Sequence, residues 1–145
     1  MAQLIFPIPA DELIVGVRVN HPGTILAAIQ AAGRPAPASV PTTGLLDTGS
    51  NVTAVSPVIL RGLAIPLAGV SRTRGVGGSV SVDLYSVSLS ILDPTRPQDP
   101  WFVQPNLLVM EMPAGLPLDV LIGMDVLLGC RLLIDGPARQ FTIDF

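Results

Sequence analysis

The sequence predicts an all-β protein, mainly β with one or two short helices, in a single domain that spans residues 1–145. Valine and isoleucine are abundant, and these β-branched residues favour strands. Fifteen prolines and fourteen glycines separate the apolar runs, which favours a sheet with many turns over a helix bundle. A length of 145 residues suits one domain with one hydrophobic core.

The first part of the chain, residues 1–23, is expected to be an extension that contains one strand. Residues 13–19 alternate well enough to form that strand, and the Asn-His-Pro-Gly sequence of residues 20–23 favours a turn. His21 lies in this turn and is the only histidine. Because no second histidine or cysteine is near it in the sequence, we expect a solvent-facing side chain rather than a metal ligand.

The next segment leads into a polar turn. The alanines of residues 24–32 favour a short helix, and the glycine and prolines of residues 33–37 favour a loop. Leu45 and Leu46 then resemble the end of a buried strand, and Asp-Thr-Gly-Ser follows directly.

This turn is the strongest chemical signal in the sequence. An aspartate at the end of a buried strand is costly unless it is paired, so Asp47 needs polar neighbours. Gly49 permits a tight reversal, and the hydroxyl groups of Thr48 and Ser50 can hydrogen-bond a carboxylate or the backbone. An ordinary Asx-type turn has the same composition. The pattern is nevertheless what acid–base chemistry at an aspartate requires.

A short helix and a long hairpin are expected after this turn. Ser56 and Pro57 are typical of a helix start, and the helix should end near Gly62, behind the Asp47 loop. Residues 72–92 then contain a glycine-rich tip and a return arm with a period of two. A phosphate-binding loop would need a lysine and a following helix, and the sequence contains no lysine.

The C-terminal half is expected to be mostly strands. Residues 93–105 contain four prolines and are expected to form a surface loop, with a short strand at residues 101–103 inside it. Cys130, the only cysteine, is expected to be a buried small hydrophobic residue. The remaining elements are strands at 106–112 and 120–122, a helix at 124–128 ended by Gly129, and a hairpin of 131–135 with 140–145.

Taken together, these motifs resemble the retropepsin family of aspartic proteases. The segment Leu45–Ser50 resembles the family's active-site loop, and Gly75–Gly78 resembles its flap. Val120–Asp125 is similar to the apolar-apolar-glycine segment and following helix, with Asp125 closer to the cellular members. Cys130–Asp135 is similar to the strand that comes next. The motifs stand in the family's order over roughly residues 24–145.

The resemblance implies a retropepsin-like acid protease barrel that is active as a two-fold homodimer. It also implies that residues 24–32 form a strand, paired across residues 33–39 with the strand of residues 40–46. Residues 72–92 would be the flap hairpin that closes over an extended peptide. In the family, the threonine at the position of Thr48 hydrogen-bonds across to the partner's loop.

The implied activity is that of an aspartic endopeptidase. Water would be activated between the Asp47 carboxylates of two copies, because the sequence contains one Asp-Thr-Gly and the reaction needs two carboxylates. Extended, hydrophobic peptide segments are the expected substrates. The expected site residues are catalytic Asp47, the supporting loop residues Thr48, Gly49 and Ser50, the flap residues Gly75, Val76, Gly77 and Gly78, and the structural residues Ile122, Gly123 and Asp125.

Two residues near this site carry separate hypotheses. If the hydroxyl of Ser50 donates to Asp47, it favours the ionised carboxylate, and Ser50→Ala should shift the pH–rate profile upward. Asp125 could serve as a second carboxylate within one chain. Its position at the start of a helix favours a capping role instead. Asp119 and Asp135 are expected to be surface or turn residues.

Other functions stay open from the sequence. A non-catalytic dimeric peptide-binding module of the same fold would keep the flap and loop without activity. A single pepsin-like lobe that needs a different partner chain would also associate. The high apolar content of 49% favours a permanent subunit interface in each case.

The composition predicts few other partners. The net charge is −3 and the eight arginines are dispersed, so we expect no nucleic-acid binding. The N-terminus has no basic region before its apolar residues, and no apolar run is long enough to span a membrane. A cytoplasmic protein without a cofactor or a metal is therefore expected.

Overall fold

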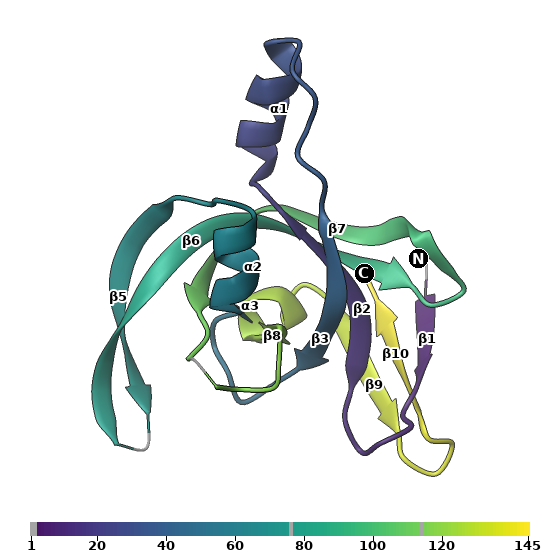
Figure 1. Ribbon diagram of the computed structural model, residues 1–145. Coiled ribbons are helices and arrows are strands. Elements are labelled where there is room, and N and C mark those ends of the chain that lie inside the picture. Colours follow the sequence, from purple (N-terminus) through teal and green to yellow (C-terminus); the bar gives the residue numbers. More distant parts are fainter. Residues whose placement is uncertain (1–2, 76, 114) are drawn as a thin grey trace.

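The computed structural model describes residues 3–75, 77–113 and 115–145, and it confirms the mainly β architecture (Figure 1). In this part of the chain, six strands form a closed barrel, because β2 pairs with β3 on one side and with β6 on the other. A further strand, β5, pairs with residues 78–85 of β6, the part that precedes the pairing with β2. The order around the barrel is β2 (Ile14–Asn20), β3 (Val40–Leu46), β8 (Val120–Ile122), β4 (Ala54–Val55), β7 (Arg96–Glu111) and β6 (Gly78–Asp93), and β5 spans Leu67–Gly75.

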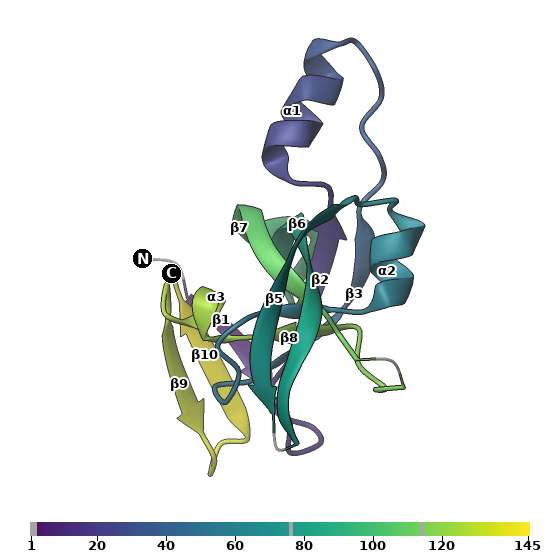
Figure 2. The same cartoon turned by 90° about the vertical axis from the view of Figure 1, so that its left-hand side faces the viewer.

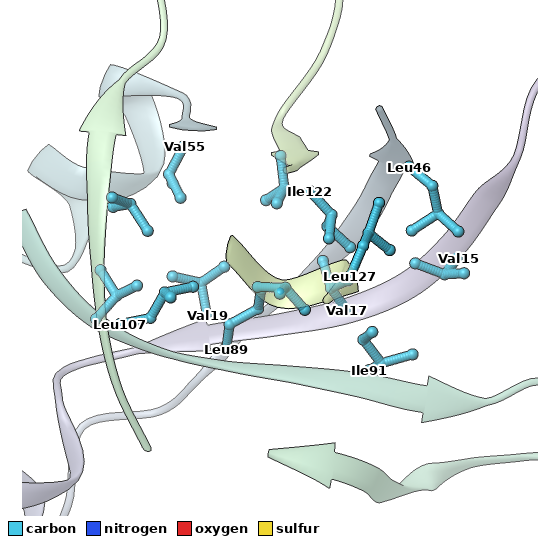
Figure 3. Packing of buried hydrophobic residues seen from close by; sticks show 14 of the residues in the cluster. Val15, Val17, Val19, Leu46, Val55, Leu89, Ile91, Leu107, Ile122 and Leu127 are labelled. Atoms are coloured by element: carbon cyan, nitrogen blue, oxygen red, sulfur yellow. The ribbon is translucent and has the colours of Figure 1, made fainter. Parts of the chain in front are cut away.

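The barrel interior is filled by alternate side chains of its strands. Val15, Val17 and Val19 of β2 are all buried, as the period of two predicts. They face the same interior as Leu89 and Ile91 of β6 (Figure 3). Burial of these branched side chains fixes the register of the strands, since a shift by one residue would turn each of them to solvent.

A second sheet is formed by strands near the two ends of the chain. The C-terminal strand β10 (Gln140–Asp144) lies between β1 (Gln3–Pro7) and β9 (Arg131–Asp135). Phe6 and Phe141 are opposite each other in this sheet, and their rings stack with centroids 4.9 Å apart. One face of the sheet therefore belongs to the same hydrophobic core as the barrel.

Two of the helices lie where the sequence predicts them. Helix α2 (Pro57–Gly62) begins after Ser56, whose hydroxyl oxygen accepts a hydrogen bond from the backbone N–H of Ile59. Helix α3 (Met124–Leu127) directly follows β8. None of the helices in the described ranges is long and apolar enough to cross a membrane.

A third helix shows that the expected strand at residues 24–32 was wrong. This segment forms helix α1 (Gly23–Ala31), and β3 pairs instead with β2 and β8. The helix extends away from the barrel and buries none of its residues (Figures 1 and 2). Because no strand pairs with this segment to select an extended backbone, the helical propensity of its alanines decides the local structure.

The turn before α1 also differs from the expectation. His21 is half-buried rather than solvent-facing, and its Nε2 lies 2.6 Å from the carbonyl oxygen of Leu63. This contact joins the turn to the end of α2, 42 residues away in the sequence. The sequence could not indicate it, because it depends on how the barrel brings the two turns together.

The expected proline-rich loop at residues 93–105 was also wrong for most of its length, although the short strand expected at residues 101–103 does lie in β7. Only a short turn follows β6, and β7 then pairs with β6 over most of this segment. Residues 96–105 of β7 pair on one side only, since β4 reaches β7 at Met110 and Glu111. A strand with one unpaired edge tolerates prolines, which explains how Pro97, Pro100 and Pro105 are accommodated.

Candidate active site

Asp47 lies at the end of β3, on a loop that is held by the neighbouring strand β8. The two strands are parallel, with Leu46 opposite Ile122, and the backbone N–H of Asp47 donates to the carbonyl oxygen of Ile122 (2.9 Å). The backbone N–H of Gly49 donates to Oδ1 of Asp47 (2.8 Å), and that of Ser50 donates to the Asp47 carbonyl oxygen (3.2 Å). The carboxyl group is thus oriented by its own turn, while the residue stays half-exposed.

Gly123 packs directly against the backbone of this loop at Ser50 and Val52. A Cβ atom at this position would lie 2.8 Å from the carbonyl carbon of Val52 and 2.9 Å from the carbonyl oxygens of Ser50 and Val52. The φ angle of Gly123 is −92°, which any residue can adopt, so close packing and not conformation requires glycine here. The next residue, Met124, donates its backbone N–H to the carbonyl oxygen of Ser50 (2.8 Å).

A buried threonine joins the loop to helix α3. Thr53 is fully buried, and its hydroxyl group donates to Oδ1 of Asp125 (2.7 Å) while it accepts from the backbone N–H of Gly123 (3.1 Å). The backbone N–H of Thr53 donates to the other oxygen of Asp125 (2.9 Å). Asp125 also accepts from the N–H of Val126 (3.0 Å). These contacts make Asp125 a brace between the C-terminal end of the loop and helix α3.

Thr53→Val is expected to destabilise the protein by about 2–3 kcal/mol, because the buried N–H of Gly123 and the Asp125 carboxylate both lose a partner. The substitution keeps the shape of the side chain. Chemical denaturation of the two proteins measures the difference. Thr95→Val is the matched control, since Thr95 makes the same type of hydrogen bond to Asp93 (2.7 Å) in an exposed turn. The control should cost less than about 1 kcal/mol, and equal losses would contradict the bracing role.

The hypothesis that Ser50 donates to Asp47 was wrong. The hydroxyl group of Ser50 donates to the carbonyl oxygen of Val52 (2.8 Å). A hydroxyl group has one proton, so it cannot also donate to the carboxylate. The effect of Ser50→Ala on the pH–rate profile therefore loses its physical basis. Thr48 and Gly49 are exposed on the same loop.

The hairpin of β5 and β6 lies beside the Asp47 loop. Its arms pair in register from Arg72 to Gly75, which is opposite Gly78, and Figure 1 shows the hairpin projecting from the barrel. A cleft of about 300 Å³ separates one arm from the loop. It is lined by Thr73 and Arg74 of β5, by Met110 of β7, and by loop residues 49–52. Val76, at the tip, lies outside the described residues.

The single cysteine is a poor alternative nucleophile. Cys130 is half-buried, and its thiol donates to the carbonyl oxygen of Leu127 (3.2 Å). Burial, with a smaller contribution from the Asp144 carboxylate, raises the pKa of the Cys130 thiol. Because the thiolate is the reactive form, the thiol is unreactive at neutral pH.

The structure therefore gathers most of the sequence-predicted residues around one loop, and it adds others. Asp47, Gly49, Ser50, Gly123 and Asp125 all contact this loop or lie on it. Sequence reasoning missed Thr53. Its role depends on Asp125, 72 residues away, and no local signal indicates that contact. It also missed Arg74 and Met110 as lining residues of the cleft.

Comparison with protein families identifies the family of the chain. The family model for aspartyl proteases matches residues 33–126, which is more than half of the chain. The protein therefore belongs to the aspartyl protease family. No curated protein sequence gives a significant match.

Solved structures show what fold the chain shares. The crystal structure of a retropepsin-like aspartic protease from Rickettsia conorii is similar, with a TM-score of 0.62 at 14% sequence identity. That similarity covers 98% of this chain and 90% of the other. The EIAV protease in complex with the inhibitor HBY-793 is similar at 20% identity with a TM-score of 0.46, over 87% of this chain and 96% of that one. The similarity to the Rickettsia conorii structure shows that the fold is retropepsin-like.

Proposed function

We propose that the protein is an aspartic endopeptidase that uses the Asp47 carboxylates of two identical subunits. The observation that carries this proposal is the position of Asp47. Its carboxyl group is oriented by the N–H of Gly49 and stays half-exposed on a loop that borders a cleft. Backbone contacts from Ile122 and Met124 fix that loop against the barrel, so the carboxylate is held on a rigid support.

The chemistry needs two carboxylates with one shared proton. The ionised group accepts a proton from the attacking water, and the protonated group donates to the carbonyl oxygen of the peptide. Two carboxylates about 3 Å apart cannot both ionise, which keeps one of them protonated over the working pH range; aspartic proteases are the standard case of this behaviour. Because each chain contributes one Asp-Thr-Gly, the second group comes from a homodimer.

The substrate is an extended peptide that lies in the cleft beside the loop. The arm of β5 borders this cleft, and Gly75, Gly77 and Gly78 surround the hairpin tip, so the hairpin acts as the flap over the peptide. A peptide in this position can be held through its backbone, as an added strand. Val52 and Met110 give the cleft apolar contacts, which favours hydrophobic side chains in the substrate.

Cleavage of a mixed peptide library from pH 3 to pH 7 tests the proposal. We expect endoproteolytic products with apolar residues next to the cleaved bond, and the highest rate at acidic pH, where one carboxyl group of the pair is protonated. Products would be identified by mass spectrometry. A folded dimer that binds peptides but cleaves none at any pH would contradict the proposal and identify a peptide-binding module instead.

A further inference from the structure

The cleft beside the Asp47 loop is lined by one charged side chain, that of Arg74 on β5. The role assigned to this side chain rests on the proposed function, in which the cleft holds the substrate peptide. None of the described residues that line the cleft is acidic. A charged group of a bound peptide therefore meets the guanidinium group of Arg74 and no competing carboxylate in the lining.

The guanidinium group of Arg74 is available to a ligand. Other arginines use theirs within the protein, since Arg18 donates to two backbone carbonyl oxygens and Arg96 and Arg139 form ion pairs. Within the described residues, Arg74 has no such partner, and it is exposed. A guanidinium group carries five N–H donors in a fixed fork, which matches the two oxygens of a carboxylate.

The hairpin that carries Arg74 is basic near its tip. Arg72 and Arg74 lie on β5, and residues 71–82 contain no acidic residue. Asp83 of the return arm lines a different cleft, where Glu111 supplies a second carboxylate. The hairpin thus presents positive charge to the cleft beside the Asp47 loop, in a protein whose net charge is −3. This arrangement favours a negatively charged side chain in that cleft.

The other lining residues favour a side chain that is partly apolar. Val52 and Met110 supply apolar contacts, and Val52 is 37% exposed. The methylene groups of a glutamate can lie against these two side chains while its carboxylate reaches Arg74. Aspartate carries the same charge on a stem that is shorter by one methylene group, so it buries less apolar surface.

We propose that Arg74 is a specificity-determining residue that selects substrate peptides with an acidic side chain, glutamate above aspartate, at a position flanking the cleaved bond. The loop lines this cleft from Gly49 onward and not at Asp47 itself. The acidic side chain therefore binds away from the reacting atoms, where it does not repel the catalytic carboxylates. Apolar residues next to the cleaved bond and one acidic residue beyond them define the substrate.

Matched peptides test the role of Arg74. A peptide that the wild type cleaves is synthesised with glutamate, glutamine or lysine at each flanking position in turn, and kcat/KM is measured at pH 6 and low salt. At one position, the glutamate peptide should be cleaved about tenfold faster than the glutamine peptide, because hydrogen bonds between charged groups are stronger than those to a neutral amide. The lysine peptide should be the slowest of the three, because like charges repel.

Charge reversal separates a direct contact from a structural effect. In Arg74→Glu the order should reverse, with the lysine peptide cleaved faster than the glutamate peptide. A folding defect would lower the rate for all three peptides alike and would leave their order unchanged. Arg72→Glu is the matched control, since Arg72 is an exposed arginine on the same strand that does not line the cleft. This control should keep the wild-type order of the peptides.

The preference should also depend on pH with a defined sign. The pKa of glutamate in a free peptide is about 4.3, whereas arginine stays protonated throughout the working range. The ratio of kcat/KM between the glutamate and glutamine peptides should therefore be full above this pH and fall toward one below it, as the carboxyl group takes up a proton. Both peptides are measured at each pH, so the titration of the Asp47 pair cancels in the ratio.

The outcomes separate the role of Arg74 from the proposed function. If the wild type cleaves peptides without a preference for glutamate at any position, or if Arg74→Glu keeps that preference, the role of Arg74 is overturned and the protease activity stands. If the wild type cleaves no peptide, the proposed function fails, and the binding of matched peptides is measured by fluorescence anisotropy instead. Tighter binding of glutamate peptides that reverses in Arg74→Glu would then support the selection by charge, and equal binding would overturn it.

Discussion

Replacement of Asp47 by asparagine is expected to lower kcat/KM for peptide cleavage on the order of 10³-fold or more, because neither subunit then supplies a carboxylate that can transfer a proton. The fold should be unaffected. Asparagine has the same shape, and its side-chain oxygen can still accept the hydrogen bond from the N–H of Gly49. Peptide cleavage followed by mass spectrometry, together with the melting temperature and the dimer mass, measures the effect.

A matched control is available in Asp119, an exposed carboxylate next to β8 that accepts a hydrogen bond from Thr42. Asp119→Asn removes one negative charge in the same way and should keep the wild-type rate. If Asp47→Asn retained substantial activity while folded and dimeric, another residue would be the proton acceptor. The proposal that Asp47 is catalytic would then be wrong.

Gly123→Ala is expected to damage both stability and activity. The new methyl group would lie within 3 Å of backbone atoms of Val52 and Ser50, and backbone atoms cannot move aside as a flexible side chain can. Overpacking of this kind costs about 1–3 kcal/mol. The loop must move to relieve the contact, and a misplacement of about 1 Å near reacting groups can cost about a hundredfold in rate.

Gly62→Ala serves as the control for this substitution. A Cβ at Gly62 would meet no atom within 4 Å, and the residue lies at the exposed end of helix α2. That variant should be neutral or more stable by about 0.4–1 kcal/mol. Denaturation and kcat/KM would be measured for both variants. A Gly123→Ala protein with wild-type stability and rate would show that the loop is not held by this close packing.

The parts of the fold that the sequence predicted are those set by local pattern or by motif order. The alternation in β2, the Ser-Pro start of α2 and the glycine tip between β5 and β6 each depend on a few neighbouring residues. Val120–Ile122 was predicted to pack beside the Asp47 loop, and β8 does pair with β3 there. These features depend on rules that act within a short stretch of chain or on a family's order of elements.

The errors arose where the presence or absence of strand pairing, or a contact between side chains in the folded protein, decides the local structure. The family's order predicts a strand at residues 24–32, but no strand pairs with them, and they form α1. Apart from the short strand expected at residues 101–103, residues 96–105 resemble a loop because of their prolines, but the unpaired edge of β7 accommodates prolines. The direction of the Ser50 hydroxyl and the contact of Thr53 with Asp125 depend on side-chain geometry in the folded protein. The last two features have no signal in the local sequence, whereas the helix α1 has one in its alanines.

The most direct test of the two-subunit site is the activity of mixtures of wild-type and Asp47→Asn subunits. The mixture is equilibrated at a concentration well above the dimer dissociation constant, and the fraction of wild-type subunits is varied at constant total protein. If both Asp47 carboxylates are required, activity follows the square of this fraction, and an equal mixture retains about one quarter of the wild-type rate. A linear dependence, with about one half of the rate retained, would show that each subunit works alone and would contradict the shared site.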